Sequence, residues 1–435
     1  MISNASSSPE SNSTAHDCDV LIVGGGPAGL SLSIALAQAG FSSIVLDQQP
    51  ASALADPAGD GREIALTHPS VQMLSRLGSW QLLAAHERGR IREAHVHDGP
   101  VEKRAGMHLD ALGSGLEHLG SIVPNAALRR TAFAVAKGCE RVRILDEAKV
   151  LQVTTSRHDA SVEFRRGEQP AQTLRAPLVV AADSRFSATR RQLGVGAQMT
   201  DFGRTVIVCR MRHEQPHLDI AHECFGYERT LAVLPLPDDP QSGQHLCSAV
   251  VTAGTAEANA LMALSPEEFT ASVQSQFDGR LGQMTLHGER HAYPLVAVYA
   301  DRFAGHRFAL LGDAAVGMHP VTAHGFNLGL ASVARLTEAL VRARDARQDI
   351  GSSATLQRYA PAHHRHAWPI FQGTNAVVRL FTDARPLPRL LRRIVLGGAN
   401  RFPPVKAAIV QQLTGKLPRL SPPSPGVPHP HLPSQ

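Results

Sequence analysis

The sequence predicts an α/β fold in which a parallel sheet covered by helices is joined to a second, mostly antiparallel sheet and followed by C-terminal helices. Three observations predict it. Residues 17–47 read as a buried strand, a glycine turn, a helix and a second strand. Two further short apolar runs, Leu178–Ala182 and Phe308–Leu311, each lead into an aspartate. Residues 200–294 contain runs of alternating apolar and polar side chains, the pattern of half-buried antiparallel strands.

The first stretch carries the fingerprint of a dinucleotide-binding turn. The apolar run Cys18–Val23 leads into three spaced glycines and an Ala/Leu-rich helix, and the next apolar run ends at Asp47. Gly24 allows the tight turn, Gly26 lets the backbone approach a pyrophosphate, and Gly29 lets helix and strand pack closely. The helix N-terminus presents free N–H groups to phosphates. A structural glycine loop in another α/β unit is the alternative, which the strand–turn–helix–strand context disfavours.

Length and composition indicate a globular chain of several parts. Its 435 residues are about three times the usual length of one domain, and 43% hydrophobic residues can form a large core. We expect a disordered tail over 1–16, the first part of a dinucleotide-binding domain over 17–199, an inserted substrate-domain sheet over 200–294, the last part of the first domain over 295–350, helices over 351–420, and a second disordered tail over 421–435.

Composition and motifs also exclude several classes of protein. Five scattered cysteines without a CxxC pair argue against a disulfide framework or a zinc site, and favour a reducing compartment. The sequence contains no run of 18 apolar residues, no secretory signal and no nucleic-acid-binding motif. We therefore expect a cytoplasmic protein that binds neither a metal nor nucleic acid. The net charge of +5 indicates anionic partners without identifying them.

The segment after the fingerprint is predicted to alternate between helices and strands. Apolar periodicity predicts helices over Val71–Leu77 and Asn125–Ala136, and strands over Ile91–Val96 and within Arg141–Phe164. Arg62 follows a polar loop one strand after the glycine turn. Its guanidinium could hold a phosphate as a bidentate clamp there, whereas in isolation it would be an ordinary surface arginine.

The inserted segment is predicted to form an antiparallel sheet with one helix. Strands are expected over Thr205–Met211, Leu231–Leu236 and Leu246–Val251, and the helix over Pro266–Phe277. In an open α/β sheet, the carboxyl ends of the strands meet at one ligand crevice. The inserted sheet would cover that crevice and shape a substrate cavity. A later helix is predicted over Leu328–Ala343.

The C-terminal part is predicted to be helical and strongly basic. Residues 374–419 carry nine basic residues against one acid, and apolar residues recur at helical spacing over Leu387–Val395. A basic amphipathic helix can lie on an anionic membrane surface. A helix packed on its own domain, with its arginines facing water, is the alternative. His363, His364 and His366 lack acidic or cysteine neighbours at ligand spacing, so we expect them on a solvated face.

Three motifs resemble those of a known family. They are GGGPAGL at Gly24–Leu30, DSRFSATR at Asp183–Arg190, and GDAA with HPVTAHGFNLGL at Gly312–Leu330. Over about residues 17–415 the sequence resembles the class A flavoprotein aromatic hydroxylases, whose prototype is p-hydroxybenzoate hydroxylase. Within them it is most similar to the ubiquinone-biosynthesis hydroxylases of the UbiH/UbiF/UbiI/UbiM group, and HPVTAHGFNLGL is most similar to the UbiM branch.

The resemblance implies FAD as the cofactor and a p-hydroxybenzoate-hydroxylase-like fold. The glycine turn would bind the ADP pyrophosphate, Asp47 the adenosine ribose, and Arg62 a phosphate. Asp313 would contact the pyrophosphate or ribityl chain. The backbone at Gly325–Asn327 would lie along the isoalloxazine, with the dipole of a helix N-terminus stabilising the anionic reduced flavin. The residues implied for FAD are Gly24, Gly26, Pro27, Ala28, Gly29, Asp47, Gln48, Arg62, Asp183, Asp313, Gly325, Phe326 and Asn327.

Two positions depart from the family pattern. The aspartate–glycine pair of the second motif is Asp183–Ser184 here, and loss of the glycine is tolerated if Ser184 has a negative φ. The change bears on the role with flavin and nicotinamide that the resemblance implies for this segment. The residue before Gly325, commonly glutamine in the ubiquinone hydroxylases, is His324. This histidine could relay a proton or stabilise an anion, or could merely replace a hydrogen bond of glutamine. His324 and Tyr227 are the candidate catalytic residues.

The resemblance implies an FAD monooxygenase that hydroxylates the aromatic ring of a polyprenylated ubiquinone precursor. Reduced flavin would react with O₂ to give a C4a-hydroperoxide, whose terminal oxygen the ring attacks. The sequence has one dinucleotide fingerprint, so NAD(P)H would bind only transiently as reductant. The basic helices would dock peripherally on the inner membrane beside other quinone-biosynthesis proteins. A hydroxylase of a soluble aromatic acid and a non-catalytic flavin-binding subunit are the alternatives.

Overall fold

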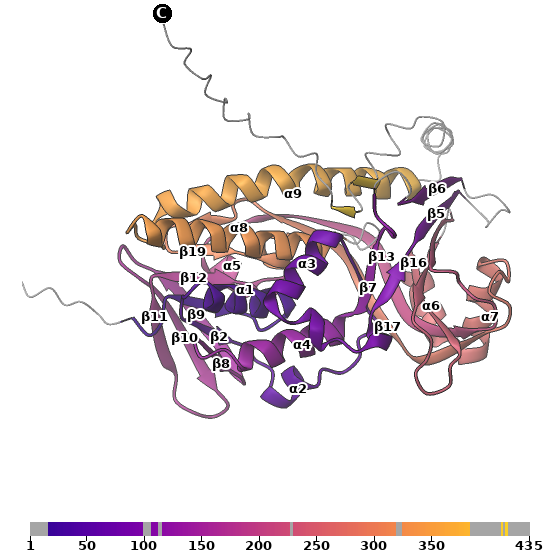
Figure 1. The fold of residues 1–435 in the computed structure, drawn as a ribbon, viewed down its shortest axis with the longest axis horizontal. Helices are drawn as coiled ribbons and strands as arrows, with labels where there is room; N and C mark the ends of the chain where they lie inside the picture. Colours follow the sequence, from indigo (N-terminus) through magenta and orange to yellow (C-terminus); the bar gives the residue numbers. More distant parts are fainter. Residues whose placement is uncertain are drawn as a thin grey trace, which may run out of the picture.

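The computed structural model describes residues 16–98, 106–111, 115–226, 229–318, 324–382, 410–411 and 414–415. Two units lie side by side (Figure 1). A six-stranded sheet with helices forms the unit at the left, and an eight-stranded sheet with α6 (Thr255–Ala263) and α7 (Pro266–Gln276) forms the unit at the right. The long helix α9 (Ser353–Thr382) runs along the top of the molecule in this view.

The six-stranded sheet brings the three predicted strand ends together. Its strands pair in parallel, except at one edge, so that Val23 on the first strand lies opposite Ala181, and Ala181 lies opposite Leu310. The apolar runs predicted to be buried strands are buried, and that prediction is confirmed. In spatial order the strands are β18 (Ala304–Gly305), β19 (Phe308–Leu310), β12 (Leu178–Ala181), β1 (Val20–Val23), β2 (Ser43–Leu46) and β8 (Val142–Leu145).

Helices cover this sheet, and the best buried of them follows the glycine turn. Eight consecutive residues of α1, Gly29–Leu36, are buried, as expected of a helix that is apolar on nearly all sides. Gly40 ends the turn after it with a φ of +88°, a conformation that glycine adopts without strain. The helices of this unit are α1 (Pro27–Gln38), α2 (Ala51–Ala55), α3 (His68–Leu77), α4 (Asn125–Lys137), α5 (Ala188–Gln192), α8 (Gly325–Asp345) and α9, with 3-10 turns η1 (Trp80–Leu82), η2 (Ala85–Glu87) and η3 (Gly312–Ala314).

Two three-stranded antiparallel sheets complete the first unit. The alternating pattern predicted within Arg141–Phe164 is observed, because inward-facing side chains of the middle strand, such as Val162 and Phe164, are buried. One sheet consists of β9 (Ala148–Thr155), β10 (Ala160–Arg166) and β11 (Gln172–Ala176), and the other of β3 (Glu63–Leu66), β7 (Gly120–Pro124) and β4 (Gly89–Ile91).

The eight-stranded sheet contains the predicted inserted strands, but it also recruits strands from outside residues 200–294. The edge pair of residues 93–110 joins it by parallel pairing with β14, a contact between distant segments that local sequence patterns do not reveal. In spatial order the strands are β20 (Val316–Gly317), β17 (Met284–Ala300), β13 (Ala197–His213), β16 (His245–Gly254), β15 (Thr230–Leu236), β14 (Ile220–Phe225), β5 (Glu93–Asp98) and β6 (Met107–Asp110).

The two faces of the eight-stranded sheet have different neighbours. One face packs against α6 (Thr255–Ala263), which the sequence did not predict, and α7 (Pro266–Gln276), which it did. The other face turns toward the first unit. There the Arg210 guanidinium lies 2.7 Å from the Glu63 carboxylate, although burial raises the pKa of Glu63 to about 7 against the effect of this arginine.

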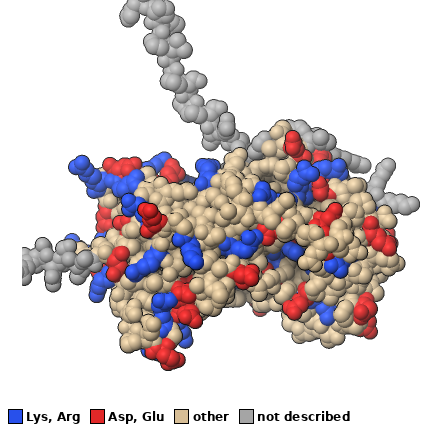
Figure 2. Space-filling model, turned by 60° about the horizontal axis from the view of Figure 1, so that its bottom comes forward, with Lys and Arg blue, Asp and Glu red and all other residues tan. Residues whose placement is uncertain are grey.

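The C-terminal predictions are only partly covered by the described residues. The basic segment Leu387–Val395, the proposed membrane helix, lies outside them, as do residues 1–15 and 416–435. Among the described residues, no helix is both long and apolar enough to cross a bilayer. Acidic and basic side chains are intermixed on the face shown in Figure 2.

The expectation that the α9 histidines form a solvated face is wrong for His363. Its side chain is only 1% exposed and stacks on the ring of Tyr359, with the two rings 5.8 Å apart. His364, in contrast, is exposed, and its Nδ1 lies 2.9 Å from the Tyr299 hydroxyl. Packing of α9 across the parallel-sheet unit buries one side of the helix, which single-residue polarity did not indicate.

Candidate active site

The glycine turn is shaped as its sequence predicts. Gly24 has a φ of +111°, and a Cβ on it would lie 2.4 Å from the carbonyl oxygen of Ala182. A Cβ on Gly29 would lie 2.0 Å from the carbonyl oxygen of Gly24. Gly26 is the N-cap residue of α1, and it has no side chain to cap the helix. Among the described residues, no atom lies within 4 Å of a Cβ built on Gly26. The turn is therefore closed where backbone must pack and open where a ligand would approach.

Asp47 lies directly beside this turn. Its carboxylate accepts hydrogen bonds from the backbone N–H groups of Gly25, at 2.7 Å, and Gln49, at 2.8 Å. These bonds fix the carboxylate at the carboxyl end of β2, where the sequence predicts a ribose contact. Gln48 is exposed next to it.

The second motif is joined to the third by a buried arginine. Arg190 is 2% exposed, and its guanidinium donates to the carbonyl oxygens of Arg185, at 3.1 Å, and Ala314, at 3.0 Å. Asp183 accepts hydrogen bonds from the Ser187 hydroxyl and, at 3.1 Å, from the backbone N–H of Thr189. In this structure the Asp183 carboxylate therefore organises the start of α5.

Ser184 does not have the negative φ that would make it a neutral replacement for glycine. Its φ is +96°, in the region that glycine adopts freely and side chains with a Cβ do not. The tight connection between β12 and α5 imposes this conformation. Ser184 thus adopts a conformation typical of glycine, at the cost of backbone strain.

In the third motif, glycines bring two helix N-termini together. A Cβ on Gly312 would lie 3.2 Å from the Cβ of Ala28 in the first turn of α1. A Cβ on Gly329, in α8, would lie 3.7 Å from the same atom. Asp313 lies beside the start of α8, since its Oδ1 is 4.0 Å from a Cβ built on Gly325, and its other oxygen is 3.2 Å from Arg185. The starts of α1 and α8 therefore flank one short stretch of backbone.

The first turn of α8 is anchored through its side chains, so that its backbone is held in place. The Asn327 amide accepts a hydrogen bond from the N–H of Thr67, at 3.0 Å, and donates one to the carbonyl of Ala65, at 2.9 Å. Phe326 packs into the apolar cluster that includes Leu66. Within the part of the chain that the structure describes, no side chain caps this helix N-terminus, so its N–H groups and dipole are available to an anion.

His324 is the N-cap residue of α8 and is buried. Burial, and to a lesser extent the charges of Arg335 and His324, lower the pKa of His366 on α9 to about 4. The predicted catalytic histidine thus lies near a second imidazole from the C-terminal helix, a relationship that the sequence did not reveal.

Arg62 is held by its own chain. Its guanidinium pairs with Asp60, with NH2 2.6 Å from Oδ2, and lies over the ring of Tyr293, 5.5 Å from the centroid. The Tyr293 hydroxyl donates to the carbonyl of Asp60 at 2.8 Å. Although burial alone would raise it, the hydrogen bond and charge of Arg62 lower the pKa of Asp60. Arg62 therefore lies where the two units of the protein meet.

A glycine turn, a carboxylate at the next strand end and two adjacent helix N-termini form the setting in which an extended dinucleotide binds. Residues 17–374 match the family described as the FAD binding domain. The chain belongs to this FAD-binding family.

Two known proteins are similar to this chain over most of its length. The chain is 44% identical over 401 residues to "Ubiquinone hydroxylase UbiM" of Neisseria meningitidis, covering 91% of this chain and 84% of that protein. It is 33% identical over 409 residues to "Ubiquinone hydroxylase UbiL" of Rhodospirillum rubrum, covering 94% and 92%. The resemblance to the ubiquinone-biosynthesis hydroxylases is therefore confirmed.

Solved structures support the predicted fold. The structure of p-nitrophenol 4-monooxygenase PnpA from Pseudomonas putida superposes with a TM-score of 0.73 at 19% identity, covering 92% of this chain and 98% of that one. The Pseudomonas aeruginosa protein pqsL superposes with a TM-score of 0.67. The p-hydroxybenzoate-hydroxylase-like architecture is thus confirmed.

The residues present fit FAD. The space over Gly26 is open, the N-termini of α1 and α8 have no side-chain caps, and the carboxylates of Asp47 and Asp313 lie beside them. These are the groups that a pyrophosphate, a ribose and a flavin would contact. Membership of the FAD-binding family and this geometry agree, so FAD is the cofactor of this protein.

Of the two catalytic candidates, only His324 can be placed, because Tyr227 lies outside the described residues. The structure adds a third candidate, Glu223 on β14. Its cross-strand partners are Ala232 and Val96, and no hydrogen bond or ion pair reaches its carboxyl group within the described part of the chain. Burial raises the pKa of Glu223 to about 8.

Glu223 lies on the sheet face that turns toward the FAD-binding unit. Along the strands its row continues through Ala232 and Val250 to Val208, and Cγ2 of Val208 lies 2.9 Å from a Cβ built on Gly61 of the first unit. The surrounding side chains in this row are apolar. The local sequence IAHECF gave no sign of this setting, because it depends on the pairing of four strands.

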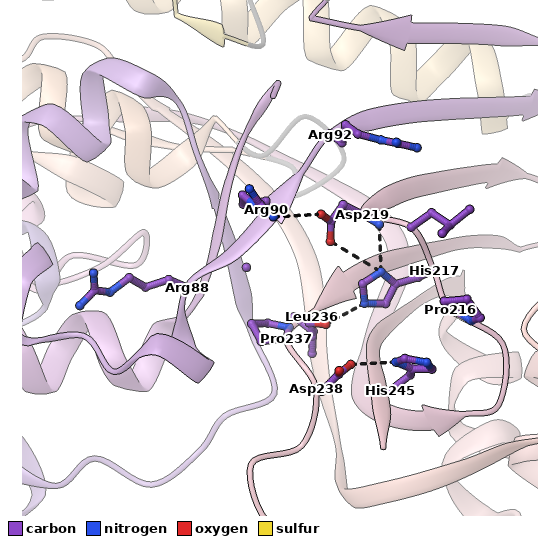
Figure 3. Close-up of a pocket in the computed structure, with 12 residues that line it drawn as sticks. Arg88, Arg90, Arg92, Pro216, His217, Asp219, Leu236, Pro237, Asp238 and His245 are labelled. Carbon is purple, nitrogen blue, oxygen red and sulfur yellow. Dashed lines mark hydrogen bonds and ion pairs between the residues drawn. The ribbon is translucent and has the colours of Figure 1, made fainter. Parts of the chain in front are cut away.

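A separate cavity of about 510 Å³ lies between β4 and the ends of β14 and β15. Figure 3 shows that several of its polar side chains contact one another. Arg90 lies 3.8 Å from Asp219, and His245 lies 2.8 Å from Asp238. None of the residues predicted to bind FAD lines this cavity. It is therefore distinct from the cofactor site.

Proposed function

We propose that this protein is an FAD-dependent monooxygenase that uses O₂ to hydroxylate the aromatic ring of a polyprenylated ubiquinone precursor. We infer the substrate class from the 44% identity to a protein named ubiquinone hydroxylase, over 91% of this chain. The converging motifs around Gly312 support the cofactor. FAD, when bound and reduced, supplies the activation of O₂ and the transfer of one oxygen atom.

The chain itself binds and orients the cofactor. The backbone of Gly24, Gly26 and Gly29, with Pro27 and Ala28, holds the pyrophosphate at the start of α1. Asp47 and the neighbouring Gln48 hold the adenosine ribose. The N-terminus of α8, at Gly325, Phe326 and Asn327, lies against the flavin, where its dipole favours negative charge. Asp183, Asp313 and Arg62 complete the site along the pyrophosphate and ribityl chain.

The sheet face opposite this site positions the aromatic ring and excludes water. Its side chains near Glu223 are apolar, as a prenylated ring requires. A ring hydroxyl needs a group that can accept its proton or hydrogen bond, because the ring reacts faster as it becomes richer in electrons. Glu223, with a pKa raised to about 8 by burial, is suited to that exchange near neutral pH. His324 and Tyr227 are the other candidates.

The reductant is NAD(P)H, bound transiently. Transient binding is supported by the sequence, which has one dinucleotide fingerprint. FAD occupies that fingerprint. Stopped-flow reduction of the enzyme-bound flavin tests it. A reduction rate that rises linearly with NAD(P)H concentration, without saturating, agrees with transient binding, and tight saturation in the micromolar range contradicts it.

The basic segment near the C-terminus docks on the inner membrane, where a polyprenylated substrate resides and other quinone-biosynthesis proteins act. Support comes from its sequence alone, with Arg389, Arg392 and Arg393 beside apolar residues at helical spacing. Replacing the three arginines by glutamate should abolish co-sedimentation with anionic liposomes. Unchanged co-sedimentation would refute docking and leave the hydroxylase proposal intact.

Quinone intermediates in a strain that lacks this protein test the proposed function. The strain should accumulate a prenylated precursor that lacks one ring hydroxyl, and expression of the protein should remove it. A normal quinone profile together with accumulation of a soluble aromatic acid would favour the alternative substrate class. Full rescue by a variant that retains no FAD would favour a non-catalytic subunit.

A further inference from the structure

Histidines from three neighbouring strands gather at the edge of the eight-stranded sheet. Alternation along β5 puts Glu93, His95 and His97 on one face. In the sheet register, His95 lies directly opposite His222 on β14 and directly opposite His108 on β6. Cross-strand partners share a face. Four imidazoles and one carboxylate are therefore presented together.

This cluster lies on the side of the sheet away from the cofactor. The ring of His222 is 5.1 Å from the ring of Phe277, which is buried in the apolar layer between the sheet and α7. Glu223, the next residue along β14, points to the opposite face. The cluster is thus separated from the proposed substrate side by the thickness of the sheet.

The distances between imidazole nitrogens in the cluster are close to those between the ligand atoms of a metal ion. One nitrogen each from His95, His97 and His222 lies within 4.8 Å of the others. Nε2 of His97 and Nδ1 of His222 are 3.2 Å apart. Two nitrogens bound tetrahedrally to Zn²⁺ at its usual bond lengths lie about 3.3 Å apart. Small rotations of the imidazoles would bring all three nitrogens to that spacing.

A carboxylate orients the cluster from one side. Glu93 Oε2 lies 3.3 Å from Nε2 of His95 and 2.8 Å from Nε2 of His108. Metal-binding histidines are commonly held by such a carboxylate. The positive charge of Arg280 acts on the imidazoles of His97 and His222. This charge would repel a bound cation, and the negative charge of Glu93 would offset the repulsion.

The cluster is buried at one end and open to solvent at the other. His97 is 1% exposed, whereas the side chain of His108 is 45% exposed. An ion could therefore reach the buried imidazoles from the side of His108.

We propose that His95, His97 and His222 bind a Zn²⁺ ion, with Glu93 orienting His95 and water in the remaining position. A set of imidazole donors favours Zn²⁺ over Mg²⁺ or Ca²⁺, which prefer oxygen. The ion fastens β5 to β14, whose histidines His97 and His222 are 125 residues apart in sequence. Without an ion, these side chains form imidazole–imidazole and imidazole–carboxylate hydrogen bonds, and Glu93 pairs with Arg92 at 3.1 Å. The experiment distinguishes the two cases.

Calorimetric titration with Zn²⁺ tests the site. The FAD-loaded full-length protein, free of any affinity tag and treated with a chelator, should bind one Zn²⁺ per chain. His97→Ala and His222→Ala should abolish this binding, and Glu93→Gln should weaken it about tenfold to a hundredfold. His245→Ala is the matched control, since His245 lies on β16 and its Nδ1 contacts Asp238. It should bind as the wild type does.

X-ray absorption at the zinc edge gives a readout that needs no variant to fold. The wild-type protein with one equivalent of Zn²⁺ should show three imidazole ligands. Unchanged FAD content of the variants shows that the rest of the fold is retained. Absence of stoichiometric binding, equal binding by His97→Ala and His222→Ala, or a spectrum without imidazole ligands overturns the proposal. If histidines near the C-terminus bound the Zn²⁺ instead, His97→Ala and His222→Ala would bind it as the wild type does.

Discussion

The buried guanidinium of Arg190 donates a hydrogen bond to the carbonyl oxygen of Ala314, at 3.0 Å, and thereby joins two motifs that are 124 residues apart. A second bond from the same nitrogen reaches the carbonyl oxygen of Arg185. The position of Asp313 in the FAD site thus depends on Arg190, which is not among the residues implied for FAD.

Replacing Arg190 by alanine should destabilise the protein and loosen FAD binding. The buried carbonyl oxygen of Ala314 would lose its donor, which costs about 1–3 kcal/mol when no water replaces it, and the partly buried one of Arg185 would lose its bond as well. Urea unfolding measures the loss. Arg191→Ala is the control, because the neighbouring Arg191 is exposed and donates only to the carbonyl of Phe186. A loss no larger than that of the control would contradict the role of Arg190.

Replacing Ser184 by glycine should stabilise the protein. The φ of +96° at this residue strains any side chain with a Cβ, and relief of the strain should exceed the added entropy of the unfolded chain by about 1 kcal/mol. The melting temperature should rise accordingly. Ser184→Ala tests the cause, since it removes the hydroxyl but keeps the strain and should bring no gain. Equal stabilisation by both variants would show that the hydroxyl, not the backbone, is responsible.

Replacing Gly26 by alanine should leave the fold intact and weaken FAD binding. The φ at Gly26 is −72° and no atom lies within 4 Å of the added Cβ, so the protein itself has room for it. The methyl group would instead occupy the approach of the pyrophosphate. Flavin fluorescence during titration should show at least a tenfold rise in the dissociation constant, which is about 1.4 kcal/mol. Gly59→Ala is the matched control, since its Cβ also meets nothing within 4 Å.

Glu223 should make the stability of the protein fall as pH rises. Its pKa in the folded protein is about 8, against an ordinary value of 4.5. Between these values the folded chain binds more protons than the unfolded chain, so the free energy of unfolding decreases with pH. The stabilisation is complete below the ordinary pKa and is lost as pH approaches 8.

Glu223→Gln should remove this dependence. Relative to the wild type, the variant should gain up to about 1.4 kcal/mol for each pH unit within that window, as measured by urea unfolding near pH 6 and near pH 8. Glu289→Gln, an exposed control on β17, should retain the slope of the wild type. If the ring hydroxyl contacts Glu223, the same variant also hydroxylates more slowly. A slope unchanged in Glu223→Gln would show that this carboxyl is not protonated by burial.

The parts of the fold that rest on local patterns could be predicted from the sequence. The runs that became β1, β12 and β19 are short, apolar and followed by glycine or aspartate, so their type and their common ligand side follow from chain order. The helix predicted over Leu328–Ala343 begins three residues earlier, at Gly325, and the place of Gly325–Asn327 beside the flavin came from the family resemblance. The residues implied for FAD at the glycine turn and at α8 lie beside one another, although their roles remain proposals.

The rest depended on contacts between distant segments. The addition of β5 and β6 to the second sheet follows from pairing with β14, and nothing within residues 93–110 specifies that partner. The Ala-rich helix α6 carries little amphipathic pattern and was not predicted. The same pairing partly buries Glu223 and assembles the histidine cluster, so neither could be found before the strand order was known.

Rescue of a deletion strain tests the central claim most directly, because it joins the FAD site to the reaction. The strain should be complemented with the wild-type protein, Gly26→Ala or Gly59→Ala, and its quinone intermediates measured by mass spectrometry. The wild type and Gly59→Ala should restore the hydroxylated quinone, whereas Gly26→Ala should leave the unhydroxylated prenylated precursor accumulated. A deletion strain with a normal quinone profile, or full rescue by Gly26→Ala despite lost FAD binding, would contradict the account.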